Sequence, residues 1–416
     1  MDGSVRGQVK NAVMERLDLS GEIRDEDVSS LIDTCIIDQT SRVYIPLKDK
    51  LELRKELFNS IRKLDVLSDL LEDDSITEIM INGPKNIFYE KAGRIYKSEK
   101  TFEDSERLEN VIQQIVGGAN RMVNESNPIV DIIMRDGSRV NVVLKGVSVD
   151  GTAVTIRKFP KEIMGMDKLI EYEAIDQRMA DVLGLLVAAG YNIFISGGTG
   201  AGKTTFLNAL TEYIPSDERV ITIEDSAELK VLGIPNLIRL EMRNANVEGK
   251  NMISIRDLIK CSLRMRPDRI IVGEVRDEAA IDMLQAMNTG HDGSLSTGHA
   301  NSAHEMLLRL ESMVLMGADL PLKAVRQQIS SAIDIVVHLG RLRDKSRRVL
   351  EIREVMGVEK DEIVTRELCR FEETGRNKDR IVGEFRKIND LLNLNKLKNA
   401  GLLEIFQEKF QDPANA

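Results

Sequence analysis

The sequence predicts an α/β fold for the C-terminal part of the chain, preceded by a smaller α+β domain and a short helical N-terminal segment. Three observations lead to this prediction. A glycine-rich motif lies between a strand-like run and a helical run, strands and helices alternate after it, and short strand-like runs with turn signals come before it. Such alternation is typical of a mostly parallel, doubly wound sheet.

The glycine-rich motif fits G-x-x-x-x-G-K-[ST] from Gly197 to Thr204. The apolar run 191–196 before it is typical of a strand, and 203–213 of a helix, which is the context that a phosphate-binding loop requires. Glycines let backbone N–H groups approach a polyphosphate, and the helix N-terminus adds partial positive charge. We expect Lys203 to reach the β- and γ-phosphates and Thr204 to hold Mg²⁺ through its hydroxyl. The expected ligands of ATP and Mg²⁺ here are Gly198, Thr199, Gly200, Ala201, Gly202, Lys203, Thr204 and Thr205.

Length and composition limit the other possibilities. A chain of 416 residues predicts two or three domains. The net charge of −10, with 4% aromatic residues and no Trp, argues against nucleic acid as the main partner. The cysteines, Cys35, Cys261 and Cys369, are far apart and predict neither a zinc ribbon nor a disulfide framework. No apolar run approaches the ~20 residues of a membrane span, and residues 1–16 lack a signal-peptide core, so we expect a cytoplasmic protein.

Hydrophobic periodicity and turn residues predict the elements in order. The N-terminal helices are expected at 5–17, 24–37 and 46–64, and the antiparallel strands of the α+β domain at 76–82, 86–90, 94–98, 129–134, 139–144 and 153–157, with a helix at 101–116. In the α/β part, strands are expected at 219–223, 237–241, 269–273, 293–297 and 334–339, and helices at 173–189, 253–265, 277–288, 303–315 and 321–331. Residues 348–355 and 362–367 extend the sheet or form a hairpin, 385–410 form one or two amphipathic helices, and 411–416 are a frayed tail.

These elements predict five divisions of the chain. They are a helical segment at 1–60, an α+β domain at 61–160, a linker at 161–172, a nucleotide-binding domain at 173–345 and its C-terminal extension at 346–416.

Acidic residues follow two of the expected strands, at the edge where open α/β sheets bind ligands. Glu224 and Asp225 follow one strand and could polarise a water or hold Mg²⁺ through a water; a solvated loop end is the alternative. Glu274 follows the other strand as a Walker B acid would, but Gly273 stands where most such enzymes have Asp. We therefore expect Glu274 to act as general base or to orient water rather than to bind Mg²⁺ directly.

Two of the four histidines flank a short expected strand. His291 precedes it and His299 follows it, so they lie roughly 27 Å apart at most and are not expected to share a metal. His299 should lie at the phosphate edge. A loop histidine with its hydrogen bonds satisfied is the alternative for each of them.

In combination, four segments resemble the Walker A, Asp box, atypical Walker B and His box of the type II/type IV secretion traffic ATPases, the GspE/VirB-type superfamily. They are residues 197–205, 221–225, 266–276 and 290–302, in that order. The stretches 77–83, 139–143, 155–159 and 290–294 resemble the CpaF branch, which powers Tad/Flp-type pili. The resemblance spans about 60 to 370, and the lack of a four-cysteine zinc insertion favours the CpaF or type IV branch.

The resemblance implies a RecA-like P-loop ATPase domain behind a PAS-like α+β domain, in homohexameric rings whose sites lie between domains. By position, Arg139 and Arg157 match arginines that reach the nucleotide phosphates, although the residues alone favour an alternating strand face. Glu274, Glu224, Arg139, Arg157 and His299 are the expected catalytic residues, and Asp225 and His291 join the nucleotide-binding set.

The implied function is an ATP-hydrolysing hexameric motor for Tad/Flp-type pilus assembly or protein secretion. It would act on an integral membrane platform protein, at the inner face of the cell membrane. The alternatives are a RecA-like nucleic-acid motor, a type IV secretion traffic ATPase and a nucleotide-gated scaffold without catalysis. The acidic balance and the few aromatic residues disfavour the nucleic-acid motor.

Overall fold

The computed structural model describes residues 3–17, 24–40, 44–159, 164–243, 251–378 and 380–410. The chain divides into two compact units, Met1–Lys161 and Glu162–Ala416. The five-part division of the sequence stays a prediction. The predicted tail at 411–416 and residues 161–163 of the predicted linker lie outside the described residues.

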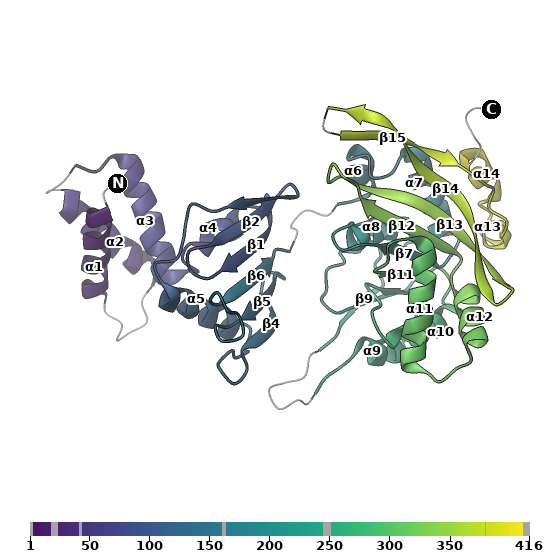
Figure 1. Ribbon diagram of the computed structural model, residues 1–416, viewed down its shortest axis with the longest axis horizontal. Coiled ribbons are helices and arrows are strands. Elements are labelled where there is room, and N and C mark those ends of the chain that lie inside the picture. Colours follow the sequence, from purple (N-terminus) through teal and green to yellow (C-terminus); the bar gives the residue numbers. More distant parts are fainter. Residues whose placement is uncertain are drawn as a thin grey trace. The chain divides into compact units, whose positions relative to one another are not determined.

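Three helices with a small apolar core begin the N-terminal unit (Figure 1). Arg54 pairs with Asp33 at 2.6 Å and Arg62 with Asp25 at 2.7 Å, so the second and third helices run antiparallel. Their apolar positions recur at three- and four-residue spacing, as the sequence predicts. The helices are α1 (Gly3–Arg16), α2 (Asp25–Thr40) and α3 (Leu47–Arg62).

A six-stranded antiparallel sheet in the order β3-β2-β1-β6-β5-β4 forms the rest of this unit. Alternate strand residues such as Ile79, Val140 and Ile156 are buried in one core with apolar residues of α5. The side chains between them point to the other face. The elements are α4 (Leu67–Glu72), β1 (Ile76–Asn82), β2 (Ile87–Lys91), β3 (Arg94–Lys97), α5 (Ser105–Gly118), β4 (Ile129–Ile133), β5 (Arg139–Val143) and β6 (Ala153–Arg157).

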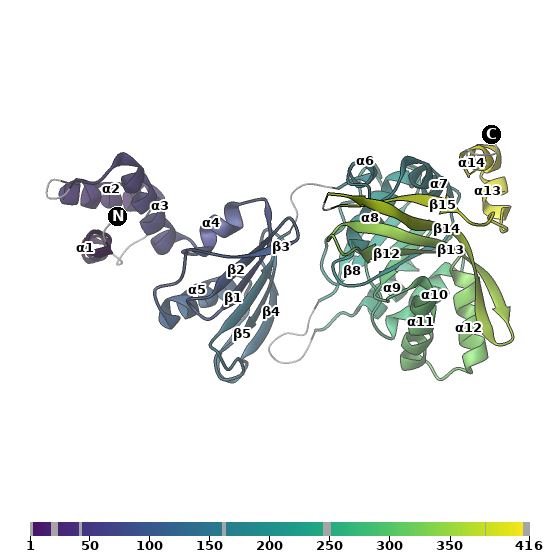
Figure 2. The same cartoon turned by 45° about the horizontal axis from the view of Figure 1, so that its top comes forward.

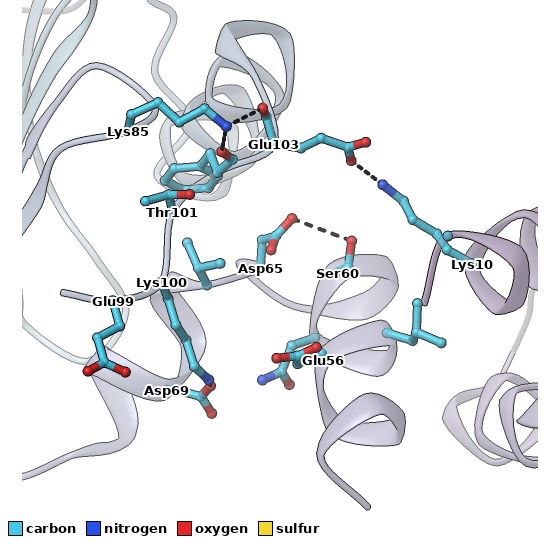
Figure 3. Close-up of a pocket in the computed structure, with 15 residues that line it drawn as sticks. Lys10, Glu56, Ser60, Asp65, Asp69, Lys85, Glu99, Lys100, Thr101 and Glu103 are labelled. Atoms are coloured by element: carbon cyan, nitrogen blue, oxygen red, sulfur yellow. Dashed lines mark hydrogen bonds and ion pairs between the residues drawn. The ribbon is translucent and has the colours of Figure 1, made fainter. Parts of the chain in front are cut away.

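A cavity of about 440 Å³ lies between α1, α3 and the start of α4 and the segments around Lys85 and 99–103 (Figure 3). Its lysines are engaged within the unit, since Lys10 pairs with Glu103, Lys100 with Asp69, and Lys85 Nζ donates to the Glu103 carbonyl at 2.7 Å. None of the predicted site residues lines it. The cavity therefore belongs to the scaffold of this unit rather than to the predicted nucleotide site.

A nine-stranded mixed sheet in the order β15-β14-β13-β12-β7-β11-β10-β8-β9 forms the second unit. The strands from β12 to β9 in this order are parallel, and β13, β14 and β15 continue the sheet antiparallel. Both of the predicted alternatives for 348–367 hold, because the hairpin also extends the sheet. The strands are β7 (Ile193–Gly197), β8 (Val220–Glu224), β9 (Leu237–Glu241), β10 (Arg269–Val272), β11 (Leu295–Gly298), β12 (Ile335–Arg341), β13 (Arg347–Glu359), β14 (Glu362–Asn377) and β15 (Arg380–Lys387).

Helices cover both faces of the parallel part of this sheet (Figure 2). Ile193 and Ile195 of β7 enter one core with α7 and α8, whereas Phe194 enters the other with α10, α11 and α12. This is the doubly wound arrangement that the alternation of elements predicts. The helices are α6 (Met166–Glu171), α7 (Gln177–Ala188), α8 (Lys203–Leu210), a 3₁₀ turn (Thr211–Tyr213), α9 (Ile255–Ser262), α10 (Ala279–Met287), α11 (Ala303–Gly317), α12 (Leu322–Ala332), α13 (Asn395–Asn399) and α14 (Leu403–Phe410).

Two predicted elements differ from the structure. The helix predicted at 173–189 begins at Gln177, because Glu173 has a left-handed φ of 59° and Asp176 caps α7 by accepting from Met179 N at 2.7 Å. Residues 385–394 were wrongly predicted to be helical, because 385–387 belong to β15 and 388–394 form the connection to α13. The buried residues Ile381 and Phe385 are four apart, a spacing that fits a helix face and a strand face equally, and pairing with β14 makes the segment a strand.

Among the described residues, no helix is both long enough and apolar enough to cross a membrane.

Candidate nucleotide-binding site

The predicted site residues of the second unit meet where parallel strands end. The glycine-rich loop follows β7, and His299, Glu274 and Glu224 stand at the carboxyl ends of β11, β10 and β8. These four strands are consecutive neighbours in the sheet. Their carboxyl ends therefore share one edge, which is the ligand edge of an open α/β sheet.

The loop itself has the backbone that its glycines permit. Gly200 and Gly202 have left-handed φ values of 72° and 92°, and Gly202 is the N-cap of α8. Gly197 is buried, and a Cβ there would lie 2.6 Å from the Leu339 carbonyl oxygen of β12. A side chain at 197 would push β12 away, so the loop needs glycine for close strand packing as well as for its turns.

Lys203 and Glu274 approach the same histidine. Lys203 is buried, and its Nζ lies 3.2 Å from His299 Nδ1 and donates to the Gly198 carbonyl at 3.2 Å. Because a lysine ammonium has only donors, Nδ1 accepts, and the ring proton is on Nε2, 2.9 Å from Glu274 Oε1. Burial and the charge of Lys203 lower the pKa of His299, which keeps the ring neutral and suited to this role. The ring thus bridges the phosphate-binding lysine and the acid.

Glu274 is also tied to the Asp box. Arg276 Nη2 donates to Glu274 Oε2 at 2.8 Å, and its Nη1 lies 3.7 Å from Asp225 Oδ2. Within the part of the chain that the structure describes, the buried Glu274 Oε1 accepts no aligned hydrogen bond. An acceptor of this kind is costly to bury unless a further donor approaches it, and a water or substrate would supply one.

Glu224 explains why Gly273 stands at the Walker B position. Its side chain is 3% exposed, and Oε2 accepts from the backbone N–H groups of Glu228 and Leu229, both at 2.8 Å. A Cβ at Gly273 would lie 3.0 Å from Glu224 Cγ, so this carboxylate fills the space that an aspartate at 273 would need. Desolvation raises the pKa of Glu224 from 4.5 to about 7.

The structure does not bring His291 to this edge. His291 precedes β11, and its Nδ1 lies 3.1 Å from the carbonyl oxygen of Ala286 at the end of α10. His299 follows the same strand. The prediction that the two histidines lie at opposite ends of one strand therefore agrees with the structure. The place of His291 in the nucleotide-binding set stays a prediction.

The two predicted arginines lie in the sheet of the N-terminal unit. Arg139 of β5 and Arg157 of β6 are direct Cα partners, and Glu78 of β1 is the next partner of Arg157. All three alternate with buried residues, so they share the face opposite α5. Like charges directly opposite each other repel, and an anion placed between them would relieve this repulsion.

Two further residues at the ligand edge were missed by the sequence reasoning. Arg347, at the start of β13, donates Nε to the carbonyl of Gly200 at 2.7 Å. The buried His338 of β12 places Nδ1 3.1 Å from the hydroxyl of Ser196, directly before the loop. Both residues reach the ligand edge because β12 pairs with β7, and no local sequence pattern predicts this pairing. The sequence signal that could have pointed to Arg347 is the arginine-rich turn 341–348 after β12.

The residues present fit a nucleoside triphosphate with Mg²⁺. Thr204 stands half-buried in the first turn of α8, beside Lys203, and the buried oxygens Glu274 Oε1 and Glu224 Oε1 have no hydrogen-bond partner among the described residues. In the same residues, no group of three or more His, Cys, Asp or Glu could hold a metal alone. Mg²⁺ suits such a site, because it keeps several waters and binds through one or two protein oxygens and phosphate.

Comparison with known proteins decides the family. The model of a family described as "Type II/IV secretion system protein" matches residues 61–411. The chain belongs to this family. The match spans the sheet of the N-terminal unit and nearly all of the second unit.

Members of this family with described roles include conjugation and secretion proteins. A putative conjugal transfer protein of Mycobacterium tuberculosis is 34% identical over 293 residues, covering 69% of this chain and 83% of the relative. The conjugal transfer protein TrbB of Rhizobium radiobacter is 31% identical, and the match covers 75% of this chain and 95% of TrbB. The type IV secretion system protein PtlH of Bordetella pertussis is 32% identical and covers 70% and 93%.

Two solved structures of this family share the fold. The ATPase DotB of Legionella pneumophila has a TM-score of 0.51 at 22% identity, covering 71% of this chain and 80% of that one. The pilus retraction motor PilT with bound ADP has a TM-score of 0.50 at 21% identity, covering 83% of this chain and 88% of that one. These likenesses support a mixed α/β architecture; the PAS-like description of the N-terminal domain stays a prediction.

Proposed function

We propose that this chain is an ATP-hydrolysing motor that works as a homohexamer and powers Tad/Flp-type pilus assembly or protein secretion. The observation that carries the proposal is the bridge from Lys203 through His299 to Glu274. This bridge joins the phosphate-binding lysine to an acid whose buried Oε1 lies 2.9 Å from His299 Nε2 but accepts no aligned hydrogen bond from the described residues. A site that only stores a nucleotide needs no such acid, whereas hydrolysis does.

Each residue has a role that its contacts support. Lys203 and the loop amides would bind the β- and γ-phosphates, and Thr204 would hold Mg²⁺, which would supply neutralising charge at the phosphate oxygens. Glu274 Oε1 accepts the proton of the attacking water or orients that water. His299 contacts both Glu274 and Lys203 and thereby couples the position of the acid to that of the lysine. Glu224 orders the loop after β8 by accepting from its backbone N–H groups. Arg276 holds the second oxygen of Glu274 and lies near Asp225.

Arg139 and Arg157 are assigned to the phosphates of the nucleotide. Their side chains share one sheet face in direct register, and a polyphosphate is the anion that would offset their repulsion. This assignment also follows the family resemblance.

The biological setting is inferred from the relatives. TrbB is named for conjugal transfer, PtlH for type IV secretion and PilT for pilus retraction, and the motifs at 77–83 and 290–294 favour the Tad/Flp branch. We infer an integral membrane platform protein as the partner, action at the cytoplasmic face of the membrane, and no role for nucleic acid. A type IV secretion traffic ATPase is the alternative.

Phosphate release by the purified chain tests the enzyme and its assembly together. We expect activity per protomer to rise with protein concentration, in step with hexamer formation measured by light scattering. Lys203→Ala should lower turnover by about 100-fold or more, because the loop loses its phosphate-binding charge. Lys168→Ala, which removes an exposed lysine of α6, is the matched control and should retain activity.

Three results would contradict the proposal. Turnover of Lys203→Ala near that of the unaltered chain would remove the site assignment. Full activity of a monomer would remove the ring. Tight, salt-sensitive binding of single-stranded DNA in a filter assay, with stimulated turnover, would favour the nucleic-acid motor instead.

A further inference from the structure

The glycine-rich loop is held from outside by one arginine. Arg347 Nε donates to the carbonyl of Gly200 at 2.7 Å. Its side chain also passes over the next turn of the loop, since a Cβ added at Gly202 would lie 3.4 Å from Arg347 Cδ. Arg347 therefore covers the two left-handed glycines of the loop.

These glycines make the loop dependent on such a contact. Glycine adopts positive and negative φ with similar ease, so Gly200 and Gly202 lose much conformational freedom when the loop takes one shape. The carbonyl of Gly200 and the N–H of Ala201 belong to one planar trans peptide and point in opposite directions. Ala201 N donates to the Gly198 carbonyl at 3.3 Å, so fixing the Gly200 carbonyl also orients the bond that closes the loop.

The backbone of Arg347 is itself firmly placed. Arg347 pairs with Arg341 across the β12–β13 ladder. The next residue, Arg348, is 4% exposed and donates to the Glu173 carbonyl at 2.7 Å, to Glu173 Oε2 at 2.8 Å and to the Ile381 carbonyl at 2.8 Å. A donor carried by such a rigid strand end can pre-order a flexible loop.

We propose that Arg347 is a positioning residue of the nucleotide site, which holds the Gly200 carbonyl and thereby pre-orders the loop for a polyphosphate. The inference rests on the proposed function, because it assigns a role within the same site. A pre-ordered loop favours the bound nucleotide before and during hydrolysis alike, so its loss weakens binding and leaves the chemical step unchanged.

The test compares two arginines of the same turn. Arg343 pairs with Glu373, and among the described residues its hydrogen bonds go to Glu373 and not to the loop, so Arg343→Ala is the matched control for Arg347→Ala. Binding of N-methylanthraniloyl-ADP is measured by fluorescence, together with KM and kcat for ATP. We expect Arg347→Ala to raise the Kd and KM about tenfold with kcat within about twofold, which corresponds to the loss of one charge-assisted hydrogen bond.

A conservative variant distinguishes positioning from general damage. Arg347→Lys keeps a cationic donor near Gly200 and should restore the Kd to within about threefold of that of the unaltered chain. Thermal unfolding of Arg347→Ala should match that of Arg343→Ala, because Arg347 is exposed. If Arg347→Ala unfolds at a lower temperature than Arg343→Ala, the Kd of Arg347→Lys tests the positioning role instead, and a Kd raised about tenfold in this variant would overturn that role.

Specific outcomes overturn this inference alone or together with the proposed function. If Lys203→Ala abolishes nucleotide binding but Arg347→Ala binds like Arg343→Ala, the positioning role is wrong and the site stands. A loss of kcat at unchanged KM in Arg347→Ala also overturns it. If the unaltered chain binds no N-methylanthraniloyl-ADP and Lys203→Ala changes nothing, both the inference and the proposed function fail.

Discussion

The two sheets of the molecule carry their charged residues in different ways. Helices cover both faces of the parallel part of the nine-stranded sheet, so its functional side chains lie at the edge, in the loops after β7, β8, β10 and β11. The six-stranded sheet has α5 in the core of one face, and Arg139 and Arg157 lie in register on the other face.

The difference shows how each sheet can contribute to one chemistry. Buried charges must be partnered, and at the edge of the large sheet His299 lies between Lys203 and Glu274, and Arg276 pairs with Glu274. On the open face of the small sheet, a like-charged pair is tolerated because water screens it. The large sheet thus assembles a site from its own residues, whereas on the small sheet Arg157 lies between Arg139 and Glu78 on an open face.

The largest effect is expected from a substitution of Glu274, in the network of paired charges at the edge of the large sheet. Glu274→Gln should keep nucleotide binding and lower turnover by about 10²- to 10⁴-fold, because an amide cannot accept the proton of the attacking water. Glu278→Gln, in the same loop but paired with Arg256 on the surface, is the control and should remain active. Phosphate release and N-methylanthraniloyl-ATP binding measure the two quantities. A loss of binding in Glu274→Gln would make Glu274 a structural residue.

A smaller effect is expected from the open face. Arg157→Gln should lower turnover by about 10- to 100-fold, since one donor to the phosphates is lost. The unfolding temperature should change little, because the substitution removes both the repulsion from Arg139 and the attraction to Glu78, each about 0.2–1 kcal/mol. Arg94→Gln, on β3 of the same sheet, serves as the control. Turnover of Arg157→Gln equal to that of Arg94→Gln would remove Arg157 from the site.

A third prediction concerns stability and its pH dependence at the covered sheet rather than turnover at a fixed pH. Burial raises the pKa of Glu224 from 4.5 to about 7, so between these values the folded chain keeps a proton that the unfolded chain releases. The folded state then binds more protons, and stability falls as pH rises through this window, by up to about 3 kcal/mol.

Glu224→Gln cannot ionise and should escape this fall. Its unfolding temperature relative to that of the unaltered chain should therefore be higher at pH 8 than at pH 5. The glutamine carbonyl can still accept from the N–H groups of Glu228 and Leu229, which limits other changes. An equal difference at both pH values would show that Glu224 is ionised throughout.

Local sequence patterns predicted much of the fold. The strands Ile76–Asn82 and Leu237–Glu241 lie where alternation placed them, and the strand–loop–helix around Lys203 follows from one motif. β13 and β14 are longer than predicted. In this long hairpin, backbone pairing keeps polar residues in strands, and hydrophobic periodicity does not detect such pairing. The helix prediction was wrong for 385–387, because the four-residue spacing of Ile381 and Phe385 fits the repeat of a helix as well as that of a strand.

The sequence by itself determined which residues could bind phosphate and which acids could follow strands, because these depend on glycine conformations and on neighbours along the chain. Only the tertiary structure decided which of them meet. β11 lies between β7 and β10, and this order lets His299 reach both Lys203 and Glu274. Pairing of β12 with β7 likewise brings Arg347 to Gly200. Strand order depends on helix packing across the sheet, and side-chain periodicity specifies the buried face of a strand but not its neighbour.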